Sequence, residues 1–209
     1  MMLNSDALRT AMDHLAAVEP GFLAGLGRVG YPEARLRSQG YETLLRTIVG
    51  QQVSVASASA IWRKLESALG EGAPAEVLLA MDFDGLRACG LSRQKQSYAR
   101  SLAELVVSGE LDLPNLPADD EEAITQLVRI NGIGRWSAEI YLLFAEGRPD
   151  VFPAGDLAVQ IELGRLLGLP ARPSEKAIRG LSEAWRPWRG AAAIFAWHHY
   201  NTGVDMLKT

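Results

Sequence analysis

The chain has 209 residues, of which 48% are hydrophobic and 22% charged, and its formal net charge is −4 at pH 7. This composition excludes disordered, collagen-like and coiled-coil proteins, and no apolar run reaches the roughly 18 to 20 residues that a membrane-spanning helix needs. A single cysteine, Cys89, excludes an internal disulfide and a four-thiolate metal site.

Apolar residues recur at helical spacing along the chain, and several of these segments begin behind Ser or Asp or end at glycine. No stretch shows the sustained alternation of a β-strand, and the loops are short and rich in Gly and Pro. We therefore predict an all-α fold. The predicted helical segments cover, in chain order, residues 8–15 behind Ser5, 41–49, 53–69, 75–81, 92–106, 119–130, 135–146, 156–167, 174–185 and 187–200.

A Gly-x-Gly turn, Gly132-Ile133-Gly134, connects two of these helices with almost no loop. Glycine permits positive φ and close backbone approach, and the second helix would present unpaired amides at its first turn. Such a terminus attracts an anion, for which nucleic-acid phosphate is a candidate, although a tight connection without a ligand explains the glycines equally well. The negative net charge argues mildly against DNA, but residues 125–209 carry 10 Lys and Arg against 8 Asp and Glu.

The hairpin stands in a run, Ile130-Asn-Gly-Ile-Gly-Arg-Trp-Ser-Ala138, that is followed by Asp150-Val-Phe-Pro-Ala-Gly-Asp-Leu-Ala-Val159. Together with three further blocks in order between about residues 40 and 200, these runs resemble the helix-hairpin-helix DNA glycosylases, and within them the 3-methyladenine DNA glycosylase II branch. The larger relatives have an additional N-terminal β domain, which we do not expect in a chain of 209 residues. The further blocks are Ile48-Val-Gly-Gln-Gln-Val-Ser54, Gly90-Leu-Ser-Arg-Gln-Lys95 and Trp185-Arg-Pro-Trp-Arg189 with the Trp197 that follows.

The resemblance implies two helical lobes with the base pocket in the cleft between them. One lobe would comprise residues 40–148, with the hairpin and with the loop that carries Gln51 and Gln52, called the wedge loop because it would enter the duplex. The other would comprise residues 1–39 and 149–209 and would carry the catalytic carboxylate, Asp156. A plain helix N-cap is the alternative interpretation of Asp156, because a helical pattern follows it directly, and one residue can serve both roles. Gly155 departs from many relatives, which have a second acid at that position.

Resemblance also assigns the base pocket, to Trp136, Trp197, Ile140 and Tyr141. Related enzymes that cut the DNA strand have lysine at the position of Trp136, so we expect a monofunctional enzyme without a Schiff base. An indole suits a cationic methylated base. The best-known relatives have an aromatic residue where this chain has Ile140, and the adjacent Tyr141 points some 100° away around the helix. Core packing is the alternative for each tryptophan, and we favour it for Trp185 and Trp188.

The expected DNA contacts come from two loops. Gln52 would fill the gap left by the extruded base, with Gln51 supporting the loop, unless the pair is an ordinary polar turn. Arg172, Lys176 and Arg179 form either a basic face beside the site or, as we favour, a solvated helix surface. The hairpin residues expected to contact DNA are Asn131, Gly132, Ile133, Gly134 and Arg135.

The sequence thus predicts a glycosylase that flips out alkylated purines such as 3-methyladenine from double-stranded DNA. We expect a monomer that needs no cofactor, and whether a monovalent cation binds the hairpin carbonyls stays open. The N-terminus lacks the basic flank and apolar stretch of a secretion signal, so we expect a cytoplasmic protein that associates with the nucleoid when engaged on DNA and that has no membrane partner. Two alternatives remain, namely a non-enzymatic DNA-binding module, which would need the hairpin alone, and a glycosylase for another class of lesion.

Overall fold

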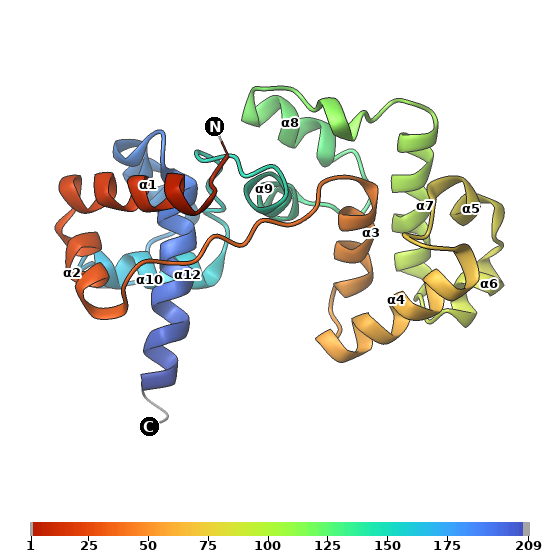
Figure 1. Ribbon diagram of the computed structural model, residues 1–209, viewed down its shortest axis with the longest axis horizontal. Helices are drawn as coiled ribbons and strands as arrows, with labels where there is room; N and C mark the ends of the chain where they lie inside the picture. Colours follow the sequence, from red (N-terminus) through yellow and green to blue (C-terminus); the bar gives the residue numbers. More distant parts are fainter. Residues whose placement is uncertain (1, 207–209) are drawn as a thin grey trace. The chain divides into compact units, whose positions relative to one another are not determined.

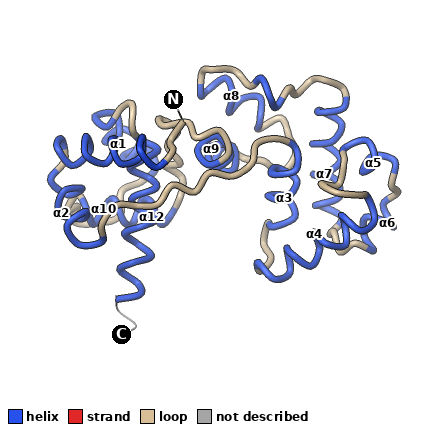
Figure 2. Tube along the Cα trace, viewed as in Figure 1, coloured by secondary structure: helices blue, strands red, loops and turns tan. Residues whose placement is uncertain are grey.

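The computed structural model describes residues 2–206, and within this range it contains helices and no strand, which confirms the all-α prediction (Figures 1 and 2). The chain folds into two compact units. Unit 1 comprises Met1–Leu36 and Glu139–Thr209, and unit 2 comprises Arg37–Ala138. Each unit has its own buried apolar core.

Unit 1 joins the two ends of the chain, because α1 and α2 pack against α12 (Figure 1). Phe22 of α2 lies edge-on to Trp185 and to Phe195 of α12, with ring centroids 5.2 and 5.9 Å apart. The helices of this unit are α1 (Ser5–Val18), α2 (Pro20–Val29), α10 (Leu157–Leu166), α11 (Glu175–Leu181), the 3-10 helix η2 (Ser182–Trp185) and α12 (Arg189–Met206).

Helix α2 was not predicted, because its glycines weaken the helical pattern. Gly21 and Gly25 are needed for packing. A Cβ on Gly21 would lie 2.0 Å from the backbone oxygen of Leu166, and one on Gly25 would lie 2.9 Å from the ring of Phe195. Helix α1 also begins differently from the prediction, since Asn4 rather than Ser5 is the N-cap and accepts a hydrogen bond from the amide of Ala7.

Unit 2 is built around α7, which packs against α3, α5 and α6. Ser92 caps α7, and Gly70 ends α4. The short helix α6 was missed, because it has only six residues and a glycine, Gly85, in its interior, which lowers its helix propensity. The helices are α3 (Tyr41–Gly50), α4 (Val55–Leu69), α5 (Ala75–Ala80), α6 (Phe83–Ala88), α7 (Arg93–Val107), the 3-10 helix η1 (Leu113–Asn115) and α8 (Asp120–Leu127).

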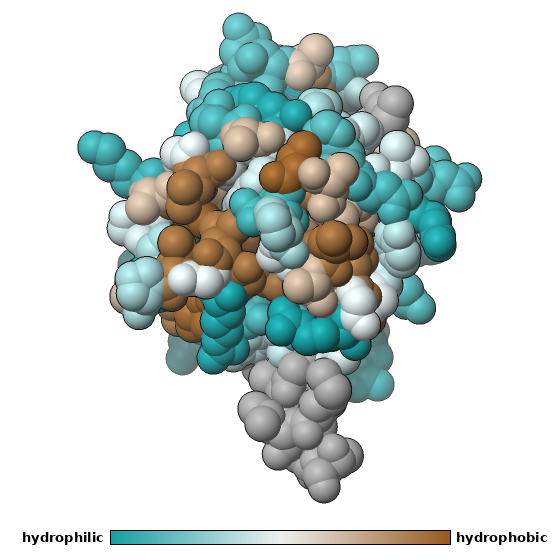
Figure 3. Space-filling view, turned by 90° about the vertical axis from the view of Figure 1, so that its left-hand side faces the viewer, coloured by the Kyte–Doolittle hydropathy of each residue, from teal (hydrophilic) through white to brown (hydrophobic). Residues whose placement is uncertain are grey.

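Helix α9 (Arg135–Phe144) begins in unit 2 and ends in unit 1. Its first residues follow the Gly-x-Gly turn, and its residues from Glu139 onward belong to unit 1, where Leu142 and Leu143 are buried. The face of the molecule that Figure 3 shows carries apolar patches among polar side chains. Exposed apolar residues of unit 1 include Val18 and Leu23, with exposed fractions of 50% and 62%.

Candidate functional site

The turn between α8 and α9 needs glycine at its centre. Gly132 has φ of +84°, and a Cβ there would lie 2.2 Å from the ring of Tyr98 on α7. Ile133 points inward, with an exposed fraction of 3%, and its amide donates to the carbonyl of Ile130 at 3.0 Å. The turn is therefore a rigid hairpin that lies directly on an aromatic ring.

The N-terminus of α9 leaves backbone donors exposed. The first helical hydrogen bond runs from the amide of Ala138 to the carbonyl of Gly134, at 3.0 Å. Among the described residues, the amides of Gly134 and Ser137 have no hydrogen-bond acceptor, and no heavy atom lies within 4 Å of a Cβ placed on Gly134. This arrangement suits an anion that approaches the helix along its axis.

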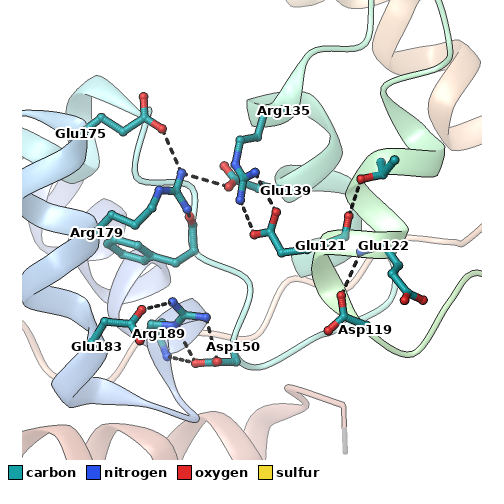
Figure 4. A network of polar contacts seen from close by, with 12 residues as sticks. Asp119, Glu121, Glu122, Arg135, Glu139, Asp150, Glu175, Arg179, Glu183 and Arg189 are labelled. Atoms are coloured by element: carbon teal, nitrogen blue, oxygen red, sulfur yellow. Dashed lines mark hydrogen bonds and ion pairs between the residues drawn. The ribbon is translucent and has the colours of Figure 1, made fainter.

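A charged pair flanks these amides. The guanidinium of Arg135 makes two hydrogen bonds to the carboxylate of Glu121, of which the one from Nη1 to Oε2 is 2.8 Å long (Figure 4). Both side chains are substantially exposed. Arg135, an expected DNA contact, is thus paired with a carboxylate that would compete with phosphate for it.

The hairpin is attached to the loop between α3 and α4. The side-chain amide of Gln51 donates to the carbonyl of Gly132 at 2.9 Å, and the amide of Asn131 donates to Ser101 Oγ at 3.1 Å. Gln52 is exposed and has φ of +55°, which is uncommon for a residue with a side chain. The structure therefore places Gln51 against the hairpin and presents Gln52 to solvent.

Lys95, whose role the sequence did not suggest, stabilises the end of α3. Its exposed fraction is 9%, and Nζ donates to the carbonyl of Val49 at 2.7 Å. Burial lowers the pKa of Lys95, because the charged ammonium loses hydration. A cation also suits the C-terminal end of a helix.

Asp156 is the N-cap of α10, which confirms that it caps this helix. Its Oδ1 accepts two hydrogen bonds, from the amide of Val159 at 3.0 Å and from the indole Nε1 of Trp197 at 3.1 Å. The residue is half-buried. The Trp197 ring packs on Phe144, with centroids 5.5 Å apart. Trp197 therefore orients the carboxylate within unit 1.

The loop before Asp156 is held at several points by side chains and backbone of unit 1 (Figure 4). Three backbone carbonyls and one carboxylate along the loop accept hydrogen bonds from the rest of unit 1, so Asp156 lies at the end of a rigid segment. The anchoring contacts are Gly190 amide to Pro149 carbonyl at 2.8 Å, Arg189 Nη2 to Asp150 Oδ2 at 2.9 Å, Arg179 Nη1 to Phe152 carbonyl at 3.3 Å and Gln160 Nε2 to Ala154 carbonyl at 2.7 Å.

The expected pocket residues differ in exposure. Trp136, in unit 2, is 47% exposed, whereas Tyr141, in unit 1, is 4% exposed. Ile140 and Trp197, both in unit 1, are half-buried. Trp185 is 2% exposed and belongs to the core, in agreement with the packing role that we favoured.

Of the three residues considered as a basic face, Arg172 and Lys176 are exposed, but Arg179 is engaged. Its Nη2 lies 3.2 Å from Glu139 Oε1 and 2.9 Å from Glu175 Oε1. Glu139 is 1% exposed and was not singled out from the sequence. A charged residue among the apolar neighbours Ala138, Leu142 and Leu143 is the signal that would have indicated it.

In the part of the chain that the structure describes, no group of His, Cys, Asp and Glu side chains is arranged to hold a metal ion. Within the same residues, no helix combines the length and apolar character that crossing a bilayer requires.

The family of this chain follows from its similarity to known proteins. Residues 45–187 match the model of the HhH-GPD superfamily base excision DNA repair protein. The chain belongs to the HhH-GPD superfamily. It is also 35% identical to DNA-3-methyladenine glycosylase 1 of Schizosaccharomyces pombe, over 77% of this chain and 72% of that protein. These matches confirm the resemblance that the motifs indicated.

Further proteins are similar to this chain in sequence or structure. DNA-3-methyladenine glycosylase 2 of Escherichia coli is 31% identical over 83% of this chain and 64% of its own length. The S. pombe 3-methyladenine DNA glycosylase in complex with abasic DNA has a TM-score of 0.75 at 32% identity, covering 93% of this chain and 97% of that one. A DNA-3-methyladenine glycosidase from Bacillus halodurans has a TM-score of 0.86 at 29% identity, covering 93% and 91%.

Proposed function

We propose that this chain is a monofunctional DNA glycosylase, which extrudes alkylated, cationic purines such as 3-methyladenine from double-stranded DNA and hydrolyses their N-glycosidic bond. Membership in a base excision repair superfamily and similarity to proteins named 3-methyladenine glycosylases support the reaction and the substrate class. The observation that carries the chemistry is the half-buried carboxylate of Asp156, which the Trp197 indole and the Val159 amide hold in one orientation.

Asp156 has the properties that this hydrolysis requires. Departure of the base leaves positive charge on the deoxyribose, and a fixed carboxylate nearby stabilises that charge. The same group orients or deprotonates the attacking water. Two N–H donors on one oxygen and the N-terminus of α10 hold the carboxylate in place, so little reorganisation accompanies the reaction.

A cationic base explains the other features of the proposed site. An alkylated purine that carries positive charge is a good leaving group, and its attraction to an indole face contributes about 0.5 to 2 kcal/mol. We assign this role to Trp136 and Trp197, with Ile140 and Tyr141 shaping the pocket. Because position 136 is tryptophan rather than lysine, no amine is available there for a Schiff base, and the reaction ends with an intact abasic strand.

DNA is gripped by the hairpin and opened by the loop attached to it. Phosphate binds the amides at the start of α9, where Asn131, Gly132, Ile133, Gly134 and Arg135 form the turn and the first residue of the helix. Gln52 enters the space that the extruded base leaves, which offsets part of the cost of unstacking. Gln51 fixes the wedge loop to the hairpin through the Gly132 carbonyl.

The experiment is base release from methylated duplex DNA under single-turnover conditions, comparing the native chain with Asp156→Asn. Asparagine caps a helix as well as aspartate does, so the variant keeps its fold and its affinity for abasic DNA. We expect base release to fall by at least about 100-fold. A matched control is Asp82→Asn, which changes the N-cap of α6 and leaves the rate unaltered.

Two results would contradict the proposal. Binding without base release by the native chain would identify a non-enzymatic DNA-binding module, and an active Asp156→Asn variant would remove Asp156 from the mechanism. A panel of duplexes with alkylated, oxidised and mismatched bases defines the lesion class. Strand cleavage after base release, or trapping of a Schiff base by borohydride, would exclude a monofunctional reaction.

A further inference from the structure

Arg179 of α11 connects the loop that leads to Asp156 with the buried side of α9 (Figure 4). Its Nη1 donates to the carbonyl of Phe152 at 3.3 Å, and its Nη2 donates to Glu139 at 3.2 Å. The same Nη2 lies 2.9 Å from Glu175, one turn earlier on α11. One planar guanidinium thus joins three elements of unit 1.

Burial makes the contact with Glu139 significant. The Glu139 side chain is 2% exposed and that of Arg179 is 29% exposed, so the carboxylate is removed from water while the guanidinium reaches the surface at one edge. A buried carboxylate needs a charged partner with defined geometry. Arginine provides donors in a rigid fork, which allows it to hold a carbonyl with one nitrogen and carboxylates with the other.

The position of Phe152 in the loop relates this pair to catalysis. Phe152 precedes Asp156 by four residues, and its carbonyl also accepts the amide of Ala154 at 2.8 Å. Gly155, directly before Asp156, lies against Glu175, because a Cβ at this glycine would be 3.5 Å from the Glu175 carboxylate. Arg179 therefore both anchors the loop and compensates a negative charge beside the residue that precedes Asp156.

We propose that Arg179 is a positioning residue for base release, which acts by fixing the Phe152–Asp156 loop to Glu139 of α9. The inference rests on the proposed function of Asp156. Trp197 and Val159 orient the carboxylate of Asp156, whereas Arg179 sets the backbone that carries it. A shift of about 1 Å at a reacting group lowers a rate by up to about 100-fold, so a looser loop slows the chemical step without weakening DNA binding.

The first test is Arg179→Lys. Lysine keeps the positive charge that Glu139 needs, but its single ammonium lacks the fork that spans Phe152 and Glu139. We expect the single-turnover rate of base release to fall between about 10- and 100-fold, with affinity for abasic DNA changed less than about twofold. The control is Arg165→Lys, an exposed ion-paired arginine of the same unit, for which rate and affinity stay unchanged.

A second variant separates positioning from stability. In Glu139→Met/Arg179→Met both charges of this pair are removed together, so neither is left buried without the other, and we expect the fold to be retained. We expect the same loss of rate as in Arg179→Lys, at a thermal midpoint close to that of the native chain. A native rate in either folded variant would overturn the inference. If the native chain itself releases no base, the proposed function is wrong. The rate of the native chain, measured beside the variants, therefore distinguishes that failure from a failure of the role of Arg179.

Discussion

Replacing Gly132 by alanine tests the geometry of the hairpin, because the residue combines two separate constraints. Its φ of +84° is unfavourable for a residue with a side chain, at a cost of about 1 to 2 kcal/mol. The added Cβ would also lie 2.2 Å from Cδ2 of Tyr98, so the ring or the turn has to move. Overpacking of this kind costs about 1 to 3 kcal/mol. We expect Gly132→Ala to destabilise the protein by about 2 to 5 kcal/mol in total.

Gly109→Ala is the matched control for this variant. Gly109 is in the same unit and has φ of +74°, but no atom lies within 4 Å of its Cβ position. The control therefore carries the backbone cost alone, and the difference between the two variants measures the contact with Tyr98. Scanning calorimetry would detect it, since 1 kcal/mol shifts the thermal midpoint by about 2 to 4 °C in a protein of this size. Equal midpoints for the two variants would refute the role assigned to Tyr98.

Three further predictions each concern a single side chain. Glu121→Gln removes the carboxylate that competes with phosphate for Arg135, so DNA affinity measured by salt titration should increase and the salt slope should steepen by about one. Trp197→Phe deletes the indole donor to Asp156, and base release in single turnover should slow by about 10- to 100-fold, since such a bond to a charged group contributes about 1.5 to 3 kcal/mol. Tyr41→Phe removes a buried hydroxyl that has no hydrogen-bond partner among the described residues, so stability in denaturant should rise by about 1 kcal/mol. Because burial raises the pKa of Tyr41, its hydroxyl ionises at a lower pH in the unfolded chain than in the folded one, and the stability of the native protein falls above about pH 10. The phenylalanine variant should lose that part of the pH dependence of stability.

Helical periodicity predicted most of the fold, because a helix that packs on the core of either unit needs apolar residues at a spacing of three and four. It failed at α2, where Gly21 and Gly25 are present for contact with Leu166 and Phe195 rather than for helix propensity. It also missed the division of the 174–185 segment into α11 and the 3-10 helix η2, a change of helix type that leaves the apolar spacing nearly intact.

The residues that fix the proposed site were harder to predict than the site itself, since their partners are distant in sequence. Gly132 was identified from the Gly-x-Gly turn, but Tyr98, the ring below it, is 34 residues away. Arg179 has the spacing of a solvated helix face, and only the fold shows that Glu139, 40 residues earlier, meets it in the interior. Local patterns report the helix on which a side chain lies and not the partner that it meets.

Asp156 is the N-cap of α10 and also the carboxylate that we propose for catalysis, and one residue can serve both roles. An N-cap side chain accepts the amide two or three residues ahead, and at Asp156 this bond goes to Val159. That constraint fixes χ angles at a place where the backbone leaves a rigid loop, which is also where a fixed carboxylate is most useful for stabilising a sugar cation. The indole of Trp197 supplies a second donor to the same oxygen, and capping alone does not require it. The extra donor is thus the structural feature that favours a catalytic role over a purely structural cap.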